Sequence, residues 1–272
     1  MADTYTQRSG TGGIIPEIWS LEVSRELQNF LLPIEQVCRV ERSTVGDVIN
    51  IGVEAIPSGV APASETTAVE SEAATYSAVQ ITIQDVVSRL KVSRQVFTLS
   101  TLDRQDLFSN MAKKVALNIT GQLCQLVVAL DDLSSTNTPM TAAIFHAAVG
   151  VLVQAGIPRS EMVAIMSPTA LQELLANAQT LGAMVPFDGH KLPSFSGTPI
   201  FETGEVRNDG ADYHNFIGSK RRALSLGLWG TPWIDVQYDQ AGGRAFFVEV
   251  GQHATAQTLQ SGAGRDLLSD GD

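Results

Sequence analysis

The side chains best suited to metal binding or acid–base catalysis are few and scattered along the chain. The four histidines are His146, His190, His214 and His253. No two of them have the i, i+4 spacing, or the spacing to cysteine, that a metal site requires. The sequence also lacks a G-x-S-x-G elbow, a P-loop and a dinucleotide fingerprint. It therefore predicts no catalytic residue, no cofactor and no metal, although a site built from distant residues would leave no such signal.

Three other features with chemical potential have simpler explanations. Cys38 and Cys124 lie in apolar surroundings and are expected to be buried free thiols, as in a chain folded in a reducing compartment. The glycine-rich stretch 10–13 precedes a predicted helix but follows no strand, so it is a poor phosphate cradle. Ser167, followed by Pro168, is better explained as a helix cap than as a nucleophile.

The one basic cluster of the sequence is the triplet Lys220, Arg221 and Arg222. Three interpretations stay open for it. It is a solvated turn, it pairs with acidic groups of a neighbouring subunit, or it faces packaged DNA. Exposed ion pairs contribute only about 0–1 kcal/mol each, so such contacts would set register more than strength.

The overall charge opposes a dedicated nucleic-acid binder. The chain has 272 residues with 18 basic and 29 acidic side chains, hence a formal charge of −11. Proteins that read nucleic acid usually carry a basic balance. No apolar run is long enough to span a membrane, and the first fifteen residues contain no secretory h-region. A protein that merely encloses nucleic acid is not excluded.

The segment 43–88 has the pattern of an extended hairpin. Apolar residues alternate from Val45 to Val53 and again from Val79 to Ile83, with a turn-rich stretch between them. The segment contains acidic residues and no lysine or arginine. A lone two-stranded ribbon is marginal in water. It is either a surface hairpin or an arm that becomes stable by lying over an adjacent subunit.

A long amphipathic helix is predicted from Ser100 to Ser134. Apolar residues recur every three or four positions from Leu107 to Leu133. At 1.5 Å per residue this helix would be roughly 45–50 Å long. It is either the core helix of an α+β enzyme or a spine on which other elements are laid.

The remaining elements alternate between helix and strand. Residues 1–13 are expected to form a flexible arm before a short helix that contains Trp19 and stops at Pro33. After a helix that starts at Met140, Met162–Met166 is predicted to be a buried strand. The stretch 182–197 is expected to be a surface loop and the tail 260–272 to be frayed. A strand at Ala245–Ala256 is expected beside the long helix and the Val86–Ser93 strand.

This order of elements resembles the major capsid proteins of tailed bacteriophages, the Hong Kong 97-type capsid fold. The resemblance covers nearly the whole chain and implies an α+β fold. The Ile15–Trp19 opening is similar to their N-terminal arm. The implied division is an N-terminal arm (1–42), an extended loop (43–88), a first peripheral part with the spine helix (89–139), an axial domain (140–239), and a second peripheral part with the tail (240–272).

The resemblance also implies a role and partners. The chain would assemble into hexamers and pentamers of an icosahedral virion shell, formed in the host cytoplasm around double-stranded DNA without sequence-specific binding. Some members join subunits by an isopeptide bond from a loop lysine, but this loop has none, so a noncovalent shell is expected. A separate scaffolding protein and a portal are expected partners, and a decoration protein is a further candidate. The expected assembly residues are Trp19, Pro57, Ser58, Gly59, Glu65, Glu70, Glu72, Lys220, Arg221 and Arg222.

Two alternatives differ in their observable products. A protein compartment of the encapsulin type would have the same fold but enclose enzymes instead of DNA. A cytoplasmic α+β enzyme would form a small oligomer with a concave pocket and perturbed titratable groups.

Overall fold

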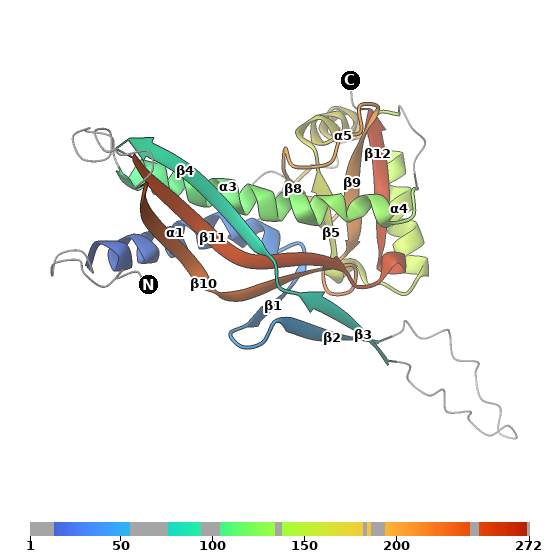
Figure 1. Cartoon of the computed structure of the whole chain (residues 1–272). Coiled ribbons are helices and arrows are strands. Elements are labelled where there is room, and N and C mark those ends of the chain that lie inside the picture. Colours follow the sequence, from blue (N-terminus) through green and yellow to red (C-terminus); the bar gives the residue numbers. More distant parts are fainter. Residues whose placement is uncertain are drawn as a thin grey trace, which may run out of the picture.

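The computed structural model of the chain describes residues 14–54, 76–93, 104–133, 138–181, 184–185, 194–239 and 245–270. These residues form a four-stranded sheet, a six-stranded sheet and a separate two-stranded hairpin, together with helices. Figure 1 shows the two larger sheets side by side, with the hairpin below them. The architecture is α+β, as predicted.

Helix α3 (Arg104–Gln125) runs across the molecule and connects the two larger sheets (Figure 1). It packs on helix α1 and on strands β11 and β4, and it reaches β9 of the other sheet. Its buried residues recur every three or four positions, as a core-facing helix requires. They are Phe108, Met111, Ala112, Val115, Ala116, Ile119, Thr120, Leu123 and Cys124.

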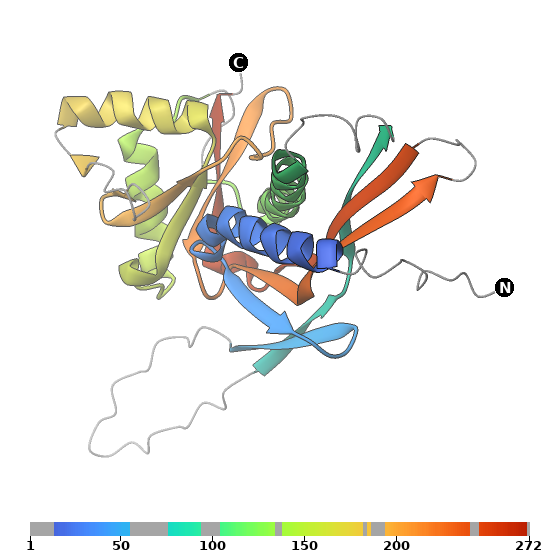
Figure 2. The same ribbon diagram turned by 90° about the vertical axis from the view of Figure 1, so that its left-hand side faces the viewer.

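Helix α1 (Ile14–Glu35) lies beside α3 in Figure 2 and packs on it and on β10. Val23, Leu27 and Ile34 are fully buried on its inner face. The helix was predicted to stop at Pro33, but it includes this residue and ends at Glu35. The Pro33 carbonyl still accepts the N–H of Gln36 at 3.1 Å, so the last turn closes after the proline. A proline in the last turn removes only one donor, its own.

The four-stranded sheet has the order β1 (Arg39–Ser43), β10 (Leu224–Asp239), β11 (Ala245–Thr258) and β4 (Asp85–Ser93). β1 runs parallel to β10, and the other neighbours are antiparallel. The strand predicted at Ala245–Ala256 is therefore confirmed as β11, which pairs with β4 and packs on α3. The pairing brings together segments that are far apart in the sequence.

The six-stranded sheet has the order β12 (Gly264–Asp270), β9 (Asp212–Ser219), β5 (Met162–Met166), β8 (Thr198–Glu202), β7 (Ser194–Phe195) and β6 (Met184–Val185). Every residue of β5 is buried, which explains why it is apolar without alternation. Helices α4 (Ala142–Gln154) and α5 (Pro168–Leu181) accompany this sheet. Ser167 caps α5, because its hydroxyl accepts the N–H of Ala170 at 3.1 Å.

Strands β2 (Val48–Glu54) and β3 (Tyr76–Thr82) pair antiparallel from Val48↔Thr82 to Glu54↔Tyr76. The predicted hairpin is confirmed for these two strands. The stretch between them, 55–75, lies outside the described residues.

The long helix is shorter than predicted. α3 ends at Gln125, and a 3-10 turn (Val127–Ala129) follows it. Leu130 is extended, Asp132 forms a β-bridge with Asp266 of β12, and the N–H of Leu133 donates to the carbonyl of Asp266 at 3.1 Å. The apolar period continues past Gln125 because this extended segment is also covered, in part by β12. The predicted start at Ser100 lies outside the described residues.

The predicted frayed tail is wrong for residues 264–270, which form strand β12. Five of its seven residues are buried and the other two are half-buried, and β12 pairs along its length with β9. β12 thus joins the sheet of the predicted axial segment, whereas β10 joins the sheet of the predicted peripheral parts. Each of these strands therefore pairs in the sheet on the other side of the expected division at residues 239 and 240, because strands pair with neighbours in space and not by order in the sequence.

Residues 182–197 were predicted to form a surface loop, but Met184–Val185 and Ser194–Phe195 pair as short strands at the edge of the six-stranded sheet. A tight turn at Ser196 and Gly197, both with positive φ, then leads into β8.

In the described part of the chain, no helix has both the length and the apolar content needed to cross a bilayer.

Candidate assembly surfaces

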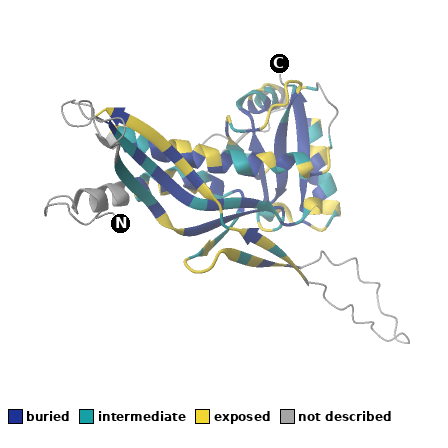
Figure 3. Cartoon of the chain, in the orientation of Figure 1, coloured by how far each residue is buried: buried dark blue, intermediate teal, exposed yellow. Residues whose placement is uncertain are grey.

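The hairpin presents two different faces. Ile51, Val53 and Ile81 are buried on one face, where they pack with Trp229 and Leu259 of the body. Asn50, Gln80 and Thr82 are exposed on the other face, and Figure 3 shows exposed residues along both strands. The root of the hairpin is therefore fixed to its own subunit, while its outer face is free for another contact.

The expected contact residues of the hairpin tip cannot be placed. Pro57, Ser58, Gly59, Glu65, Glu70 and Glu72 all lie outside the described residues. Trp19 falls within α1, but its side chain is also outside the described part of the structure.

The basic triplet forms the tight turn between β9 and β10. The N–H of Lys220 donates to the carbonyl of Glu161 at 2.9 Å, which ties the turn to the 3-10 helix Arg159–Glu161. Arg221 lies 4.0 Å from the Glu161 carboxylate, and its side chain is 78% exposed. An ion pair that is this exposed adds little to the stability of the subunit. The charge of Arg221 thus remains available to a partner outside the subunit.

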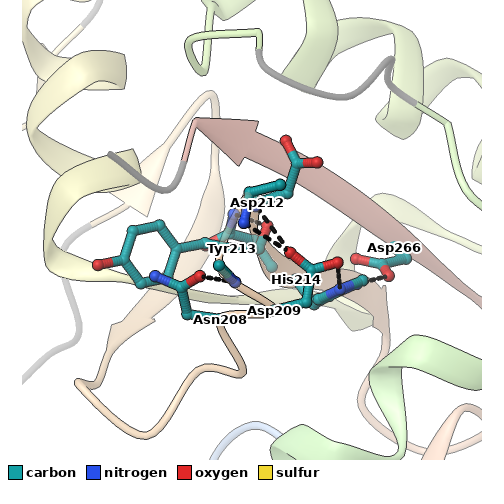
Figure 4. Close-up of polar contacts among 9 residues, drawn as sticks. Asn208, Asp209, Asp212, Tyr213, His214 and Asp266 are labelled. Atoms are coloured by element: carbon teal, nitrogen blue, oxygen red, sulfur yellow. Dashed lines mark hydrogen bonds and ion pairs between the residues drawn. The ribbon is translucent and has the colours of Figure 1, made fainter.

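A buried polar cluster, which the sequence did not indicate, joins strands β9 and β12 (Figure 4). Nδ1 of His214 lies 2.6 Å from Oδ2 of Asp266, and its Nε2 lies 3.5 Å from Oδ2 of Asp209. Asp266 is fully buried, and its other oxygen has no hydrogen-bond partner among the described residues. A histidine between two carboxylates is held in one orientation, which fixes the contact between the two strands.

The two carboxylates of this cluster titrate differently. Burial raises the pKa of Asp266 to about 6, against the lowering effect of the hydrogen bond from His214. The backbone N–H groups of Asp212 and Ala211, at 2.9 and 3.0 Å from Oδ1, lower the pKa of Asp209. One acid is therefore destabilised when charged, and the other is stabilised.

The cysteines and the other described histidines form no reactive cluster. Burial raises the pKa of both thiols, Cys38 and Cys124, to about 12, so neither is a nucleophile near neutral pH. Both are free and buried, as predicted. His146 is exposed, and His253 forms an ion pair with Asp85. Within the described ranges, no three side chains of the metal-binding types gather closely enough to hold an ion.

Comparison with known proteins gives no sequence relative. No protein-family model matches the chain, and no curated protein matches it either.

The fold, in contrast, matches solved structures over most of the chain. One is the "Capsid structure of the Cyanophage P-SCSP1u", with a TM-score of 0.60 and 11% identity over 88% of each chain. Another is the capsid of a native GTA particle, with a TM-score of 0.61 and 13% identity over 88% of this chain and 90% of that one. A virus-like particle from Pyrococcus furiosus has a TM-score of 0.61 and 12% identity over 90% and 97%.

These likenesses define the fold of the chain. It is the fold of the major capsid proteins of tailed bacteriophages, as the sequence predicted. Coverage of both partners is high, so the match is between whole chains and not between single motifs. At identities this low the likeness establishes the architecture, and function must be argued from the surfaces described above.

Proposed function

We propose that this chain is the major coat protein of a phage head. Many copies assemble into hexamers and pentamers of an icosahedral virion shell that encloses double-stranded DNA. The observation that carries the proposal is a capsid fold whose hairpin is fixed to the body on one face and open on the other. Identical chains with such a projecting element form closed symmetric assemblies by repeating one contact.

In this proposal the work of the protein is mechanical. The predicted scaffolding protein, portal and decoration protein remain proposed partners, and assembly in the host cytoplasm is part of the proposal. The basic turn is proposed to contact an acidic surface of a neighbouring subunit, because Arg221 is 78% exposed and its ion pair with Glu161 is long, at 4.0 Å. The division of the chain into arm, extended loop, peripheral parts and axial domain also remains a proposal. In it, β10 is now assigned to the peripheral part and β12 to the axial domain.

The proposed role of the hairpin tip can be tested without disturbing the body. Glu54 and Tyr76 lie directly opposite each other in the ladder, so a two-residue Asn-Gly turn can replace residues 55–75. The shortened subunit should unfold at the same urea concentration as the full chain but yield few or no closed shells. Normal shells from this variant would refute the overlapping arm.

The content of the particles distinguishes a phage head from a protein compartment, and a denaturing gel shows whether the subunits are covalently joined. Electron microscopy of purified particles should show closed shells, and nuclease-protected DNA should be found inside them. Protein in place of DNA would favour a protein compartment of the encapsulin type. A small oligomer that forms no shell would refute both. On a denaturing gel, mature particles should run as monomers, because the segment 43–88 has no lysine for an isopeptide bond.

A further inference from the structure

Both ends of the hairpin leave the body at one transverse row of the four-stranded sheet. In this row Ser43 of β1 lies opposite Trp229 of β10, and Trp229 lies opposite His253 of β11. His253 in turn lies opposite Asp85 of β4. Ser43 is the last residue of β1, and Asp85 is the first residue of β4. The chain between them, 44–84, is therefore inserted at the two ends of a single row.

Trp229 links this row to the apolar face of the hairpin. Its side chain is only 3% exposed and packs with Ile51, Val53 and Ile81 of the hairpin in a cluster separate from the main core. Gly227 leaves the space for the indole, because a Cβ there would lie 3.0 Å from two of its ring carbons. Trp229 and Leu259 are thus the buried body residues of this cluster, and Trp229 is the larger of the two.

Polar contacts pin the backbone of the hairpin at the same place. The N–H of Ala254 donates to the carbonyl of Gln84 at 2.9 Å, and the Thr255 hydroxyl donates to the carbonyl of Thr82 at 2.8 Å. Beyond the row, the pairing of β10 with β11 is interrupted until Trp233, and Gly230 has a φ of 61°. A bulge of this kind bends a strand. The row therefore marks the point where β1 ends, β4 begins and the ladder between β10 and β11 is interrupted.

We propose that Trp229 is a positioning residue that fixes the angle between the hairpin and the body, and that uniform shell assembly depends on this angle. The cluster is small and separate from the main core. Removing its largest member should therefore free the hairpin and leave the body folded. The second half of the proposal rests on the proposed function, whereas the first half concerns the single subunit.

The test compares hydrogen exchange in the unassembled full-length chain and three variants. In Trp229→Ala the amides of 49–53 and 77–83 should exchange at least about tenfold faster, while those of β5 and β9 keep their rates. Leu259→Ala removes the other body residue of the cluster and should loosen the same amides. Trp233→Ala, a matched tryptophan on the same strand outside the cluster, should leave the hairpin amides unchanged.

A conservative variant separates packing from other effects. The indole N–H of Trp229 has no hydrogen-bond partner among the described residues, so Trp229→Phe should retain hairpin protection within about twofold. Unchanged hairpin exchange in Trp229→Ala would overturn the proposal. Equal acceleration in hairpin and body would also overturn it, because Trp229 would then be an ordinary core residue.

Electron microscopy of assembled particles tests the second half. Trp229→Ala should give irregular shells of several sizes, and Trp229→Phe shells like those of the natural chain. If the hairpin loosens but uniform shells still form, the link from hairpin angle to assembly is wrong. If the natural chain forms no shell at all, the proposed function fails, and the exchange result still decides the role of Trp229 within the subunit.

Discussion

Replacing Asp266 by asparagine should remove most of the rise in stability that the subunit gains on mild acidification. Asp266 is fully buried at the pairing of β12 with β9, and one of its oxygens has no partner among the described residues. The groups that face it are His214, Asp209 and Asp132. Asparagine has nearly the same shape and can still accept a hydrogen bond from His214. The substitution therefore removes the charge and changes little else.

The magnitude follows from the pKa of the folded state. Burial raises the pKa of Asp266 to about 6 from an ordinary value of 3.8. The folded chain then binds this proton more tightly than the unfolded chain. The resulting stabilisation is complete below the lower value and is lost as the pH rises through the higher one. Between pH 7.5 and pH 4.5 linkage gives a gain of about 2 kcal/mol in the free energy of unfolding.

Urea unfolding of the unassembled subunit at pH 7.5 and pH 4.5 measures this gain. The difference between the natural chain and Asp266→Asn should change by about 2 kcal/mol between the two pH values. Asp209→Asn is the matched control, because the pKa of Asp209 is lowered from 3.8 and its stabilisation is lost only below this pH range, so its difference from the natural chain should change little between the two pH values. If Asp266→Asn and the natural chain change in parallel, within about 0.5 kcal/mol, the inferred titration of Asp266 is wrong.

Two further substitutions test the packing of β9 and the basic turn. A Cβ at Gly218 would lie 2.6 Å from the ring of Phe216 and 2.8 Å from backbone atoms of Ala263 and Gly264. Gly218→Ala should therefore destabilise the subunit by about 1–3 kcal/mol. Gly262→Ala, with no atom near its Cβ, is the control, and equal urea midpoints for both would contradict the inferred crowding. Arg221→Glu should change the free energy of unfolding by less than about 1 kcal/mol. It should nevertheless reduce the yield of shells at low salt, which sedimentation measures. If the variant and the natural chain give equal yields at every salt concentration, the turn makes no charged contact between subunits.

Elements with a regular apolar period could be predicted from the sequence. The alternation from Val45 to Val53 and from Val79 to Ile83 gave strands β2 and β3 in their correct pairing. The run Met162–Met166 gave the buried strand β5. In both cases the period of two, or its absence in a strand covered on both faces, follows from how side chains leave an extended backbone.

Elements whose stability comes from distant partners could not be predicted. The polar and glycine-rich stretch before Asp270 has no period, yet it forms β12 because β9 offers a complete ladder of hydrogen bonds. The apolar period from Leu107 to Leu133 does not show that the helix ends at Gln125, since a buried extended segment is also apolar.

The candidate functional residues divide in the same way. The basic triplet that contains Arg221 was found in the sequence, because a run of three basic residues is visible without coordinates. Its exposure was shown by the structure. His214 and Asp266 were not identified together, since 52 residues separate them. Trp229 had no marker in the sequence that set it apart from Trp233.

The sequence by itself determined the class of fold, the presence of an acidic hairpin without lysine, and the absence of any local catalytic motif. The class of fold was implied by the resemblance in the order of elements, and the other two properties follow from the residues that the chain contains. Only the tertiary structure decided where α3 ends, that β12 is a strand, and that Trp229 lies in the row from which the hairpin departs. Those outcomes depend on contacts between segments far apart in the chain, because a buried backbone or carboxylate is defined by the partners that surround it.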